Sequence, residues 1–203
     1  MLEKEKFYKL TLIKKIIFFS KIFLFYFIST NISSADLQKD IISKLTSTKT
    51  MSFNFNQKIA GREEVGNCFI KYPLLMKCNY KNLKEKVLIS NGKTVAVIKK
   101  KYKKIYFYPL KSTPLFTILD KNKVLNLIRN TKPSKIDSNI IKFEFTDKKL
   151  NKLKIFFDEK TLKFKGWETI DAYSNNVSFI ITNIKINNQI VDSFFTIPQE
   201  SDL

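Results

Sequence analysis

The 203-residue chain is long enough for one domain, and its 19 Phe and 8 Tyr residues supply much of the apolar area that a core needs. It contains no His and only two Cys, which argues against His-based catalysis and a closed zinc site, so we expect no enzyme, no metal and no cofactor. The net charge of +19 does not indicate nucleic-acid binding, because the lysines are dispersed apart from Lys99–Lys101 and Lys103–Lys104, without a phosphate-binding loop or helix-turn-helix pattern.

The N-terminal 35 residues have the three parts of an export signal. Lysines precede an apolar run from Ile16 to Ile28, and Ser33-Ser34-Ala35 offers small residues for cleavage. A membrane anchor is the alternative, but it needs about 20 uninterrupted apolar residues. This run is shorter and contains Lys21. We therefore expect residues 1–35 to be a secretory signal cleaved after Ala35, and residues 36–203 to form a single domain.

A helix and a strand are the first elements expected in that domain. Apolar residues four apart over 37–45 predict one face of an amphipathic helix. Phe53 and Phe55 alternate with polar residues over 52–59, which is the pattern of a strand with one buried face.

A hairpin is expected over residues 67–80, with its turn at Tyr72-Pro73-Leu74. One face would carry the side chains that alternate about this turn, namely Cys68, Ile70, Tyr72, Met76, Cys78 and Tyr80. Cys68 and Cys78 are symmetric about Pro73, so we expect their sulfurs on neighbouring strands, opposite each other. They form either a cross-strand disulfide in an oxidising compartment or two buried free thiols, because directly opposed pairs often fit disulfide geometry poorly.

Asn91-Gly92 predicts a second hairpin within residues 86–98. This dipeptide is a strong hairpin signal because a type I′ turn requires φ > 0 at both central residues. A strand over 104–110 follows, and Pro114 near the start of an apolar segment predicts a helix over 113–120.

A second short helix is expected over 122–130, ended by Pro133. The rest of the chain has strand patterns at residues 140–145, 153–157, 162–170, 177–186 and 193–197. About ten short strands with few helices predict a mainly β protein whose antiparallel sheet curves into a barrel or half-barrel.

Several short motifs of this chain occur together in one known family. They are the export signal and the following helix, Phe55-x-Gln57, Gly66, Lys71-Tyr72-Pro73, residues 88–95, residues 109–119 and Phe195-x-x-Pro198. In combination they resemble the periplasmic outer-membrane lipoprotein carrier family, LolA, over residues 36–203.

The resemblance implies an incomplete, half-open antiparallel β-barrel with a short-helix lid over an apolar cavity. It assigns the acyl-chain cavity to Phe53, Phe55, Ile70, Met76 and Cys78. It assigns the lid to Leu115, Phe116, Ile118 and Leu119. Periodicity alone would make the same phenylalanines ordinary core.

Two positions depart from the family pattern. The Arg that usually precedes the corner proline and helps to hold the lid is Tyr72 here. A phenol can donate one hydrogen bond to a lid carbonyl but not several. Tyr72 is therefore the expected lid latch, in a closed state held differently or less firmly. The C-terminal Pro-x-Gly of the family reads Pro198-Gln199-Glu200.

The function that the resemblance implies is transport without catalysis. A monomeric periplasmic carrier would take lipid-modified proteins from an ATP-driven exporter of the inner membrane, shield their acyl chains, and pass them to an outer-membrane receptor. The alternatives are an envelope sensor and a general lipid- or glycolipid-binding protein on the same fold.

Overall fold

The computed structural model describes residues 34–81, 85–135, 139–146, 152–171 and 174–203. Residues 34–203 form one compact unit. The expected export signal therefore lies almost entirely outside the described residues, and its cleavage after Ala35 stays a prediction. No helix in the described ranges is long and apolar enough to cross a membrane.

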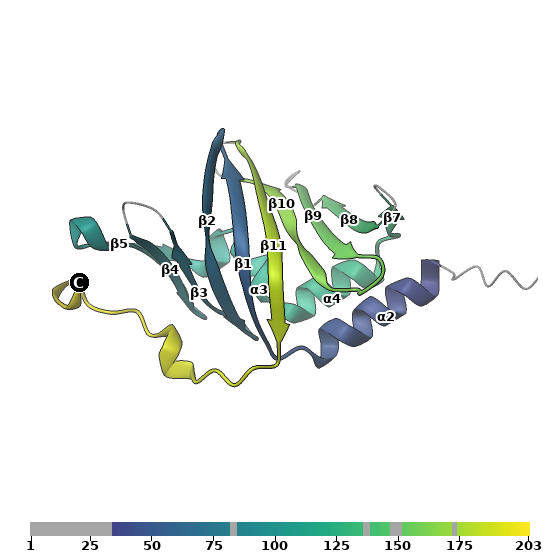
Figure 1. Cartoon of the computed structure of the whole chain (residues 1–203), viewed down its shortest axis with the longest axis horizontal. Helices are drawn as coiled ribbons and strands as arrows, with labels where there is room; N and C mark the ends of the chain where they lie inside the picture. Colours follow the sequence, from purple (N-terminus) through teal and green to yellow (C-terminus); the bar gives the residue numbers. More distant parts are fainter. Residues whose placement is uncertain (1–33, 82–84, 136–138, 147–151, 172–173) are drawn as a thin grey trace, which may run out of the picture. The chain divides into compact units, whose positions relative to one another are not determined.

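One eleven-stranded sheet forms the body of the unit, with the strand order β6-β5-β4-β3-β2-β1-β11-β10-β9-β8-β7 (Figure 1). The strands are β1 (Thr50–Ile59), β2 (Arg62–Lys71), β3 (Leu75–Tyr80), β4 (Lys86–Asn91), β5 (Thr94–Lys99), β6 (Lys104–Pro109), β7 (Ser134–Lys135), β8 (Ile140–Thr146), β9 (Lys152–Asp158), β10 (Phe164–Ile170) and β11 (Asn176–Ile186). Within the described residues the two edge strands, β6 and β7, do not pair with each other, so the sheet stays open. The expected mainly β, half-open antiparallel architecture is confirmed.

The chain builds this sheet as two meanders joined by helices. Strands β1 to β6 pair in sequence order, and β7 to β11 do the same. The last strand then returns to the first, with Ile59 of β1 opposite Val177 of β11. Between the meanders lie η2 (Leu110–Ser112), α3 (Leu115–Leu119) and α4 (Lys121–Arg129).

Three helices cover one face of the sheet, which we call the inner face. They are α3, α4 and the N-terminal α2 (Ser34–Ser47), and each contributes buried residues to one apolar cluster with the strands (Figure 1). Helix α2 is longer at both ends than the predicted 37–45, and α3 is shorter than the predicted 113–120. The principal core therefore lies between the inner face and these helices.

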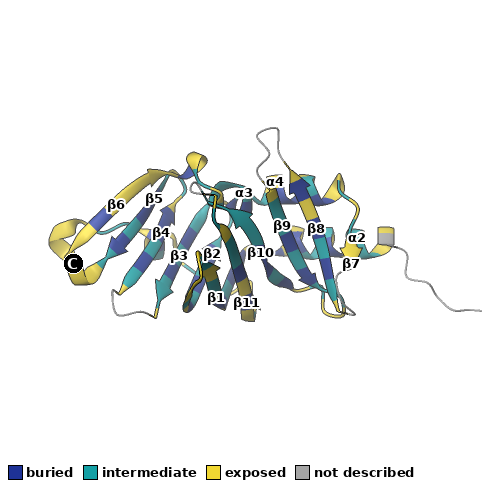
Figure 2. Cartoon of the chain, turned by 90° about the horizontal axis from the view of Figure 1, so that it is seen from above, coloured by how far each residue is buried: buried dark blue, intermediate teal, exposed yellow. Residues whose placement is uncertain are grey.

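The opposite, outer face has a smaller core over β4 to β6. Its buried members are Val87, Ile89, Ala96, Ile98 and Ile105, with Ile197 and Leu203 of the C-terminal segment packed against them. Figure 2 shows the buried positions alternating with less buried ones along these strands. The end of the chain is thus part of the fold.

The Asn91-Gly92 hairpin forms, but the predicted type I′ turn is wrong. Strand β4 ends at Asn91 and β5 begins at Thr94, so Gly92 and Lys93 are the central residues. Gly92 has φ of +92°, whereas Lys93 is not in the positive-φ region. One positive φ at the first central position is the pattern of a type II′ turn. The Asn91 side chain accepts the N–H groups of Lys93 (3.1 Å) and Thr94 (2.9 Å), which explains its place at the strand end.

The predicted strand over 193–197 is also wrong. This segment begins with the short helix η3 (Asp192–Phe195), continues without a strand partner, and ends near η4 (Glu200–Asp202). The Phe194 ring packs edge-on against Phe69 of β2, with 5.0 Å between ring centroids. The alternating apolar residues of this C-terminal segment therefore pack across the outer face of the sheet, and the segment does not add a strand to it.

Candidate functional site

The five residues predicted to line a cavity lie on neighbouring strands of the inner face. Phe53 of β1 is opposite Cys68 of β2, which is opposite Cys78 of β3. Ile70 of β2 is opposite Met76 of β3. All five predicted side chains, Phe53, Phe55, Ile70, Met76 and Cys78, are at most 3% exposed and belong to one apolar cluster. We call this part of the inner face the floor.

Aromatic rings extend the floor across the centre of the sheet. Phe55 stacks on Phe179 of β11 at 4.7 Å between centroids, and Phe179 stacks on Trp167 of β10 at 4.1 Å. Trp167 in turn stacks on Phe164 at 5.9 Å. No motif in the sequence marked these three partners. Their alternation within the predicted strands 162–170 and 177–186 was the available signal, but it could not show that the rings would meet.

Gly66 makes room for this aromatic row. It lies opposite Phe55 in the pairing of β1 and β2. A Cβ atom added at Gly66 would lie 2.7 Å from the Phe55 ring and 2.1 Å from the Asn79 carbonyl oxygen. The absence of a side chain therefore lets the phenyl ring lie directly over the β2 backbone.

The two cysteines lie in the floor and are joined. Cys68 and Cys78 face each other across β2 and β3 and form a disulfide. Of the two alternatives that the sequence left open, the structure thus has the cross-link. It ties together two strands of the surface that α3 covers.

Helix α3, which the family resemblance assigns to the lid, packs in the same apolar cluster as the floor. Ile118 and Leu119 are buried in the same cluster as the floor, at 2% and 0% exposure. Leu115 and Phe116 are half-buried and pack against its edge. The helix has only five residues and follows Pro114. Few hydrogen bonds within its own backbone therefore stabilise it.

The contact between α3 and the β2–β3 turn is made by backbone atoms. The Leu74 N–H donates to the Leu119 carbonyl oxygen at 3.1 Å. Tyr72, the predicted latch, is anchored by its own N–H, which donates to the Lys49 carbonyl at 2.9 Å. Within the described part of the chain no hydrogen bond joins the Tyr72 hydroxyl to α3. Burial raises the pKa of that hydroxyl, so it stays neutral.

Lys121, which no motif in the sequence marked, links the region between α3 and α4 to the end of α2. It directly follows the residue that separates α3 from α4. Its Nζ donates to the carbonyl oxygens of Thr46 and Thr48, both at 3.0 Å, and lies 5.7 Å from the centre of the Tyr72 ring. No sequence signal could have indicated this role, because the acceptors are backbone carbonyls, which every residue has.

The inner face has a polar end at β1 to β4. The Tyr80 hydroxyl donates to Gln57 Oε1 at 2.8 Å, and the Tyr80 ring packs on Phe55. Lys86 forms an ion pair with Glu64, and its Nζ lies 3.7 Å from the Tyr80 ring centre. Burial, with a smaller effect of the Glu64 charge, raises the pKa of Tyr80. These contacts form a polar boundary to the apolar surface.

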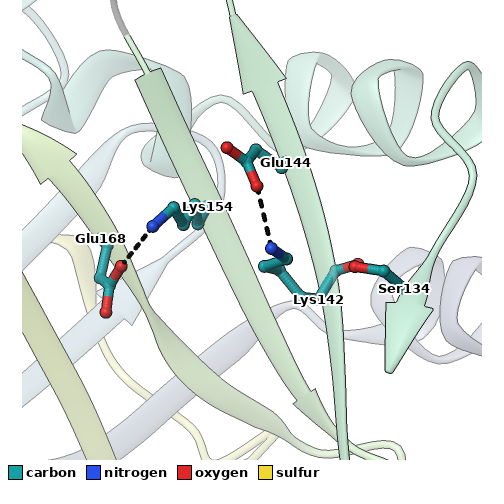
Figure 3. Close-up of polar contacts among 5 residues, drawn as sticks. All are labelled: Ser134, Lys142, Glu144, Lys154 and Glu168. Atoms are coloured by element: carbon teal, nitrogen blue, oxygen red, sulfur yellow. Dashed lines mark hydrogen bonds and ion pairs between the residues drawn. The ribbon is translucent and has the colours of Figure 1, made fainter. Parts of the chain in front are cut away.

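The outer face of β8 to β10 is polar. Lys142 pairs with Glu144 at 2.9 Å, and Lys154 pairs with Glu168 at 3.1 Å (Figure 3). A depression of about 290 Å³ on this side is lined by Lys58, Lys152, Lys154, Glu168, Thr169, Ile170, Asn176, Val177 and Ser178. Its lining does not suit acyl chains. In the described ranges no group of three or more metal-ligating side chains is placed to hold an ion.

Comparisons with known proteins agree on one family. The family model described as outer membrane lipoprotein carrier protein LolA matches residues 46–198. An outer-membrane lipoprotein carrier protein of Francisella tularensis subsp. novicida (strain U112) is 29% identical over 205 residues, covering 89% of this chain and 93% of the relative.

Solved structures with little sequence identity resemble the fold. A conserved protein of uncharacterized function from Thermus thermophilus superposes with a TM-score of 0.50 at 10% identity, covering 82% of this chain and 95% of that one. A LolA superfamily protein from Nitrosomonas europaea gives a TM-score of 0.43 at 9% identity, covering 79% of this chain and 97% of that one.

Proposed function

We propose, from the premise that this chain belongs to the outer membrane lipoprotein carrier (LolA) family, that its floor binds the acyl chains of lipid-modified proteins. The family is one of carriers, not of enzymes. The observation that carries the proposal is the apolar floor of β1 to β3 beneath a five-residue helix. That arrangement provides an apolar surface that is covered when no cargo is bound.

Acyl chains need such a surface because exposing them to water is costly. Each methylene removed from water contributes about 0.8 kcal/mol, so a chain of about 16 carbons is worth on the order of 12 kcal/mol. The Phe, Ile and Met side chains of the floor present no directional groups and can adapt to flexible chains. Left uncovered, the same surface would promote aggregation.

The lid makes binding reversible. We infer that acyl chains must displace Ile118 and Leu119, which belong to the same buried cluster as the floor. The free energy of lid closure is subtracted from the affinity for cargo. Release at a destination therefore needs no chemical step in this chain.

The route of the cargo is the finer part of the proposal. We propose that the chain is exported with residues 1–35 as a cleaved signal and works in the periplasm as a monomer. It would receive lipoproteins from an ATP-driven exporter of the inner membrane and deliver them to an outer-membrane receptor. The relative from Francisella carries the name of a lipoprotein carrier, which supports this direction of transport.

The test is release of a lipoprotein from inner-membrane vesicles into solution. The protein would be added with ATP, and the soluble lipoprotein measured. We expect release that depends on the added protein and falls at least about tenfold for Ile70→Asp or Met76→Asp, because a carboxylate in the floor opposes acyl-chain binding.

Val191→Asp is the matched control, because Val191 is 69% exposed and lies outside the floor. It introduces the same charge and should leave release unchanged. Release that proceeds without the protein, or that Val191→Asp lowers as much as the floor variants, would contradict the proposal.

A further inference from the structure

One end of the sheet exposes positive charge and aromatic rings together. Five lysines lie within the six residues 99–104, and Tyr106, Phe107 and Tyr108 follow on the edge strand β6. The three rings are 44%, 58% and 48% exposed, and Tyr102 between the lysines is 52% exposed. Figure 2 shows β6 as a largely exposed strand at the end of the sheet. We call residues 99–108 the basic aromatic edge.

Little of this positive charge is neutralised within the chain. Among the described residues, only one of these five lysines forms an ion pair: Lys104 lies 3.7 Å from Glu200. Lys99 lies 4.9 Å from the centre of the Tyr106 ring. Lys100, Lys101 and Lys103 are exposed at the β5–β6 turn. The turn therefore presents a concentrated charge, unlike the dispersed lysines elsewhere in the chain.

Protection of an edge strand against aggregation would explain the lysines but not the rings. Lysine side chains block the addition of a further strand, and Glu200 Oε1 already accepts the Ile105 N–H at 3.0 Å. Three consecutive exposed aromatic residues would have the opposite effect. Tyr106 and Tyr108 point to one face of the strand and Phe107 to the other, so rings flank the edge on both sides.

We propose that the basic aromatic edge docks on the surface of a bilayer that contains anionic lipids. Lysines are attracted to anionic headgroups, and tyrosine and phenylalanine rings partition into the interface between headgroups and acyl chains. A peptide strand that adds to β6 is a poorer fit for this edge. The Ile105 N–H already donates to Glu200, and Pro109 has no N–H to donate.

This docking rests on the proposed carrier function and adds a place where cargo is exchanged. Pro109 ends the docking strand, and Leu115 begins the lid six residues later. Leu110, between them, is fully buried, and its N–H donates to the Lys93 carbonyl at 2.9 Å. A bilayer held at β6 would thus lie near the start of the lid.

Vesicle flotation of residues 34–203, which form a compact unit with their own core, tests the proposal. The vesicles would contain phosphatidylcholine alone or with about a quarter of phosphatidylglycerol, without any lipoprotein. We expect binding only to the anionic vesicles, and its loss in about 0.5 M salt, which screens exposed charges. Each lysine near an anionic surface contributes about fivefold in affinity. The affinity for anionic vesicles should therefore fall about 100-fold in the triple variant Lys100→Gln/Lys101→Gln/Lys103→Gln.

The control is Lys39→Gln/Lys160→Gln/Lys163→Gln, which removes the same charge from exposed positions elsewhere. It should lose far less affinity. An equal loss in both variants would show attraction by net charge alone and would overturn the proposal. So would the absence of binding to anionic vesicles, in which case the charge would serve a protein partner or none.

A fluorescence measurement reports contact of the rings with lipid. The single native tryptophan, Trp167, is buried at 4% exposure and gives a constant background. Phe107→Trp should shift its emission to the blue with anionic vesicles, whereas Val191→Trp should not. No shift at either position would contradict insertion of the edge. These vesicles carry no cargo, so a failure here leaves the lipoprotein-release test of the carrier function unaffected.

Discussion

Both halves of the inner face are apolar, but they are covered in different ways. Over β8 to β10, helices α2 and α4 pack on buried rings such as Phe143 and Phe157. The Gln38 side chain of α2 donates to the Ile128 carbonyl of α4 and to the Thr131 carbonyl at 3.2 Å, which ties the two helices together. Over β1 to β3, the cover is α3 with two fully buried side chains.

The comparison shows where the fold can open at low cost. Removing α4 would uncover Val124, Leu125 and Ile128 together with the aromatic rings beneath them. Removing α3 would uncover Ile118 and Leu119 and break the hydrogen bond from Leu74 to Leu119. The α4 half is therefore expected to be the stable scaffold, and the α3 half the part that exchanges one apolar partner for another.

The largest expected difference between the halves comes from one substitution made in each. Ile128→Ala in α4 and Ile118→Ala in α3 both remove buried methyl groups, at 0% and 2% exposure, and each should lower the free energy of unfolding by about 2–4 kcal/mol. Because only Ile118 competes with cargo, Ile118→Ala alone should bind a diacylated lipopeptide more tightly. Urea unfolding and lipopeptide titration measure the two effects. Tighter binding by Ile128→Ala would erase the proposed distinction.

Removing the disulfide should weaken the floor itself. The bond joins β2 to β3 across a sequence separation of 10 residues, so Cys68→Ala/Cys78→Ala should lower the free energy of unfolding by about 2–3 kcal/mol. Urea unfolding with and without a reductant measures this loss. A wild-type midpoint that does not respond to the reductant would show that the bond contributes nothing to the stability of this half.

Replacing Lys121 should loosen the lid with a smaller effect on overall stability. Lys121→Gln shortens the side chain that donates to the Thr46 and Thr48 carbonyls, a loss of about 1 kcal/mol. Lid opening should therefore become about fivefold more frequent, because 1.4 kcal/mol corresponds to a factor of ten. Faster hydrogen exchange at Leu74 and tighter lipopeptide binding should follow. The exposed Lys132→Gln is the control, and equal exchange rates in the two variants would remove Lys121 from the mechanism.

Mild acid should have the smallest effect, confined to the scaffold half. Hydrogen bonds from the backbone and side chain of Thr161 lower the pKa of Asp158 below its usual value at the end of β9. The contribution to stability is present above the pKa of an unfolded Asp, about 3.9, and is lost as the pH falls through the lower folded value. Asp158 is largely solvated, so the loss should stay below about 1 kcal/mol. Asp158→Asn should unfold with a flatter pH dependence between about pH 5 and pH 3, and an unchanged slope would contradict this.

Some of this arrangement could be predicted because local patterns determine it. The position of Pro73 predicted that Cys68 lies opposite Cys78, and the alternation of residues predicted that Phe53 and Phe55 share a buried face. Whether those phenylalanines are core or binding surface could not be read from their periodicity, which is the same in both cases. The contacts that hold the lid were equally hidden, since Lys121 and Leu74 act through backbone atoms.

The C-terminal segment shows the opposite kind of failure. Its alternation of apolar residues has the period of a strand, but β1 already has β2 and β11 on its two sides, and Glu200 occupies part of the β6 edge. The segment instead packs Phe194 on Phe69 and Lys77. Pattern alone therefore predicts which side chains are buried better than it predicts which strand they accompany.

Hydrogen exchange of the Leu74 amide during lipopeptide titration tests the central claim most directly. That N–H is protected by the Leu119 carbonyl only while α3 lies on the floor. If acyl chains displace the lid, exchange at Leu74 should accelerate as the diacylated peptide saturates the protein, while amides of β9 and β10 stay protected. An amide that remains equally protected at saturation would show that cargo binds without moving α3, and the account of a lid competing for the floor would be wrong.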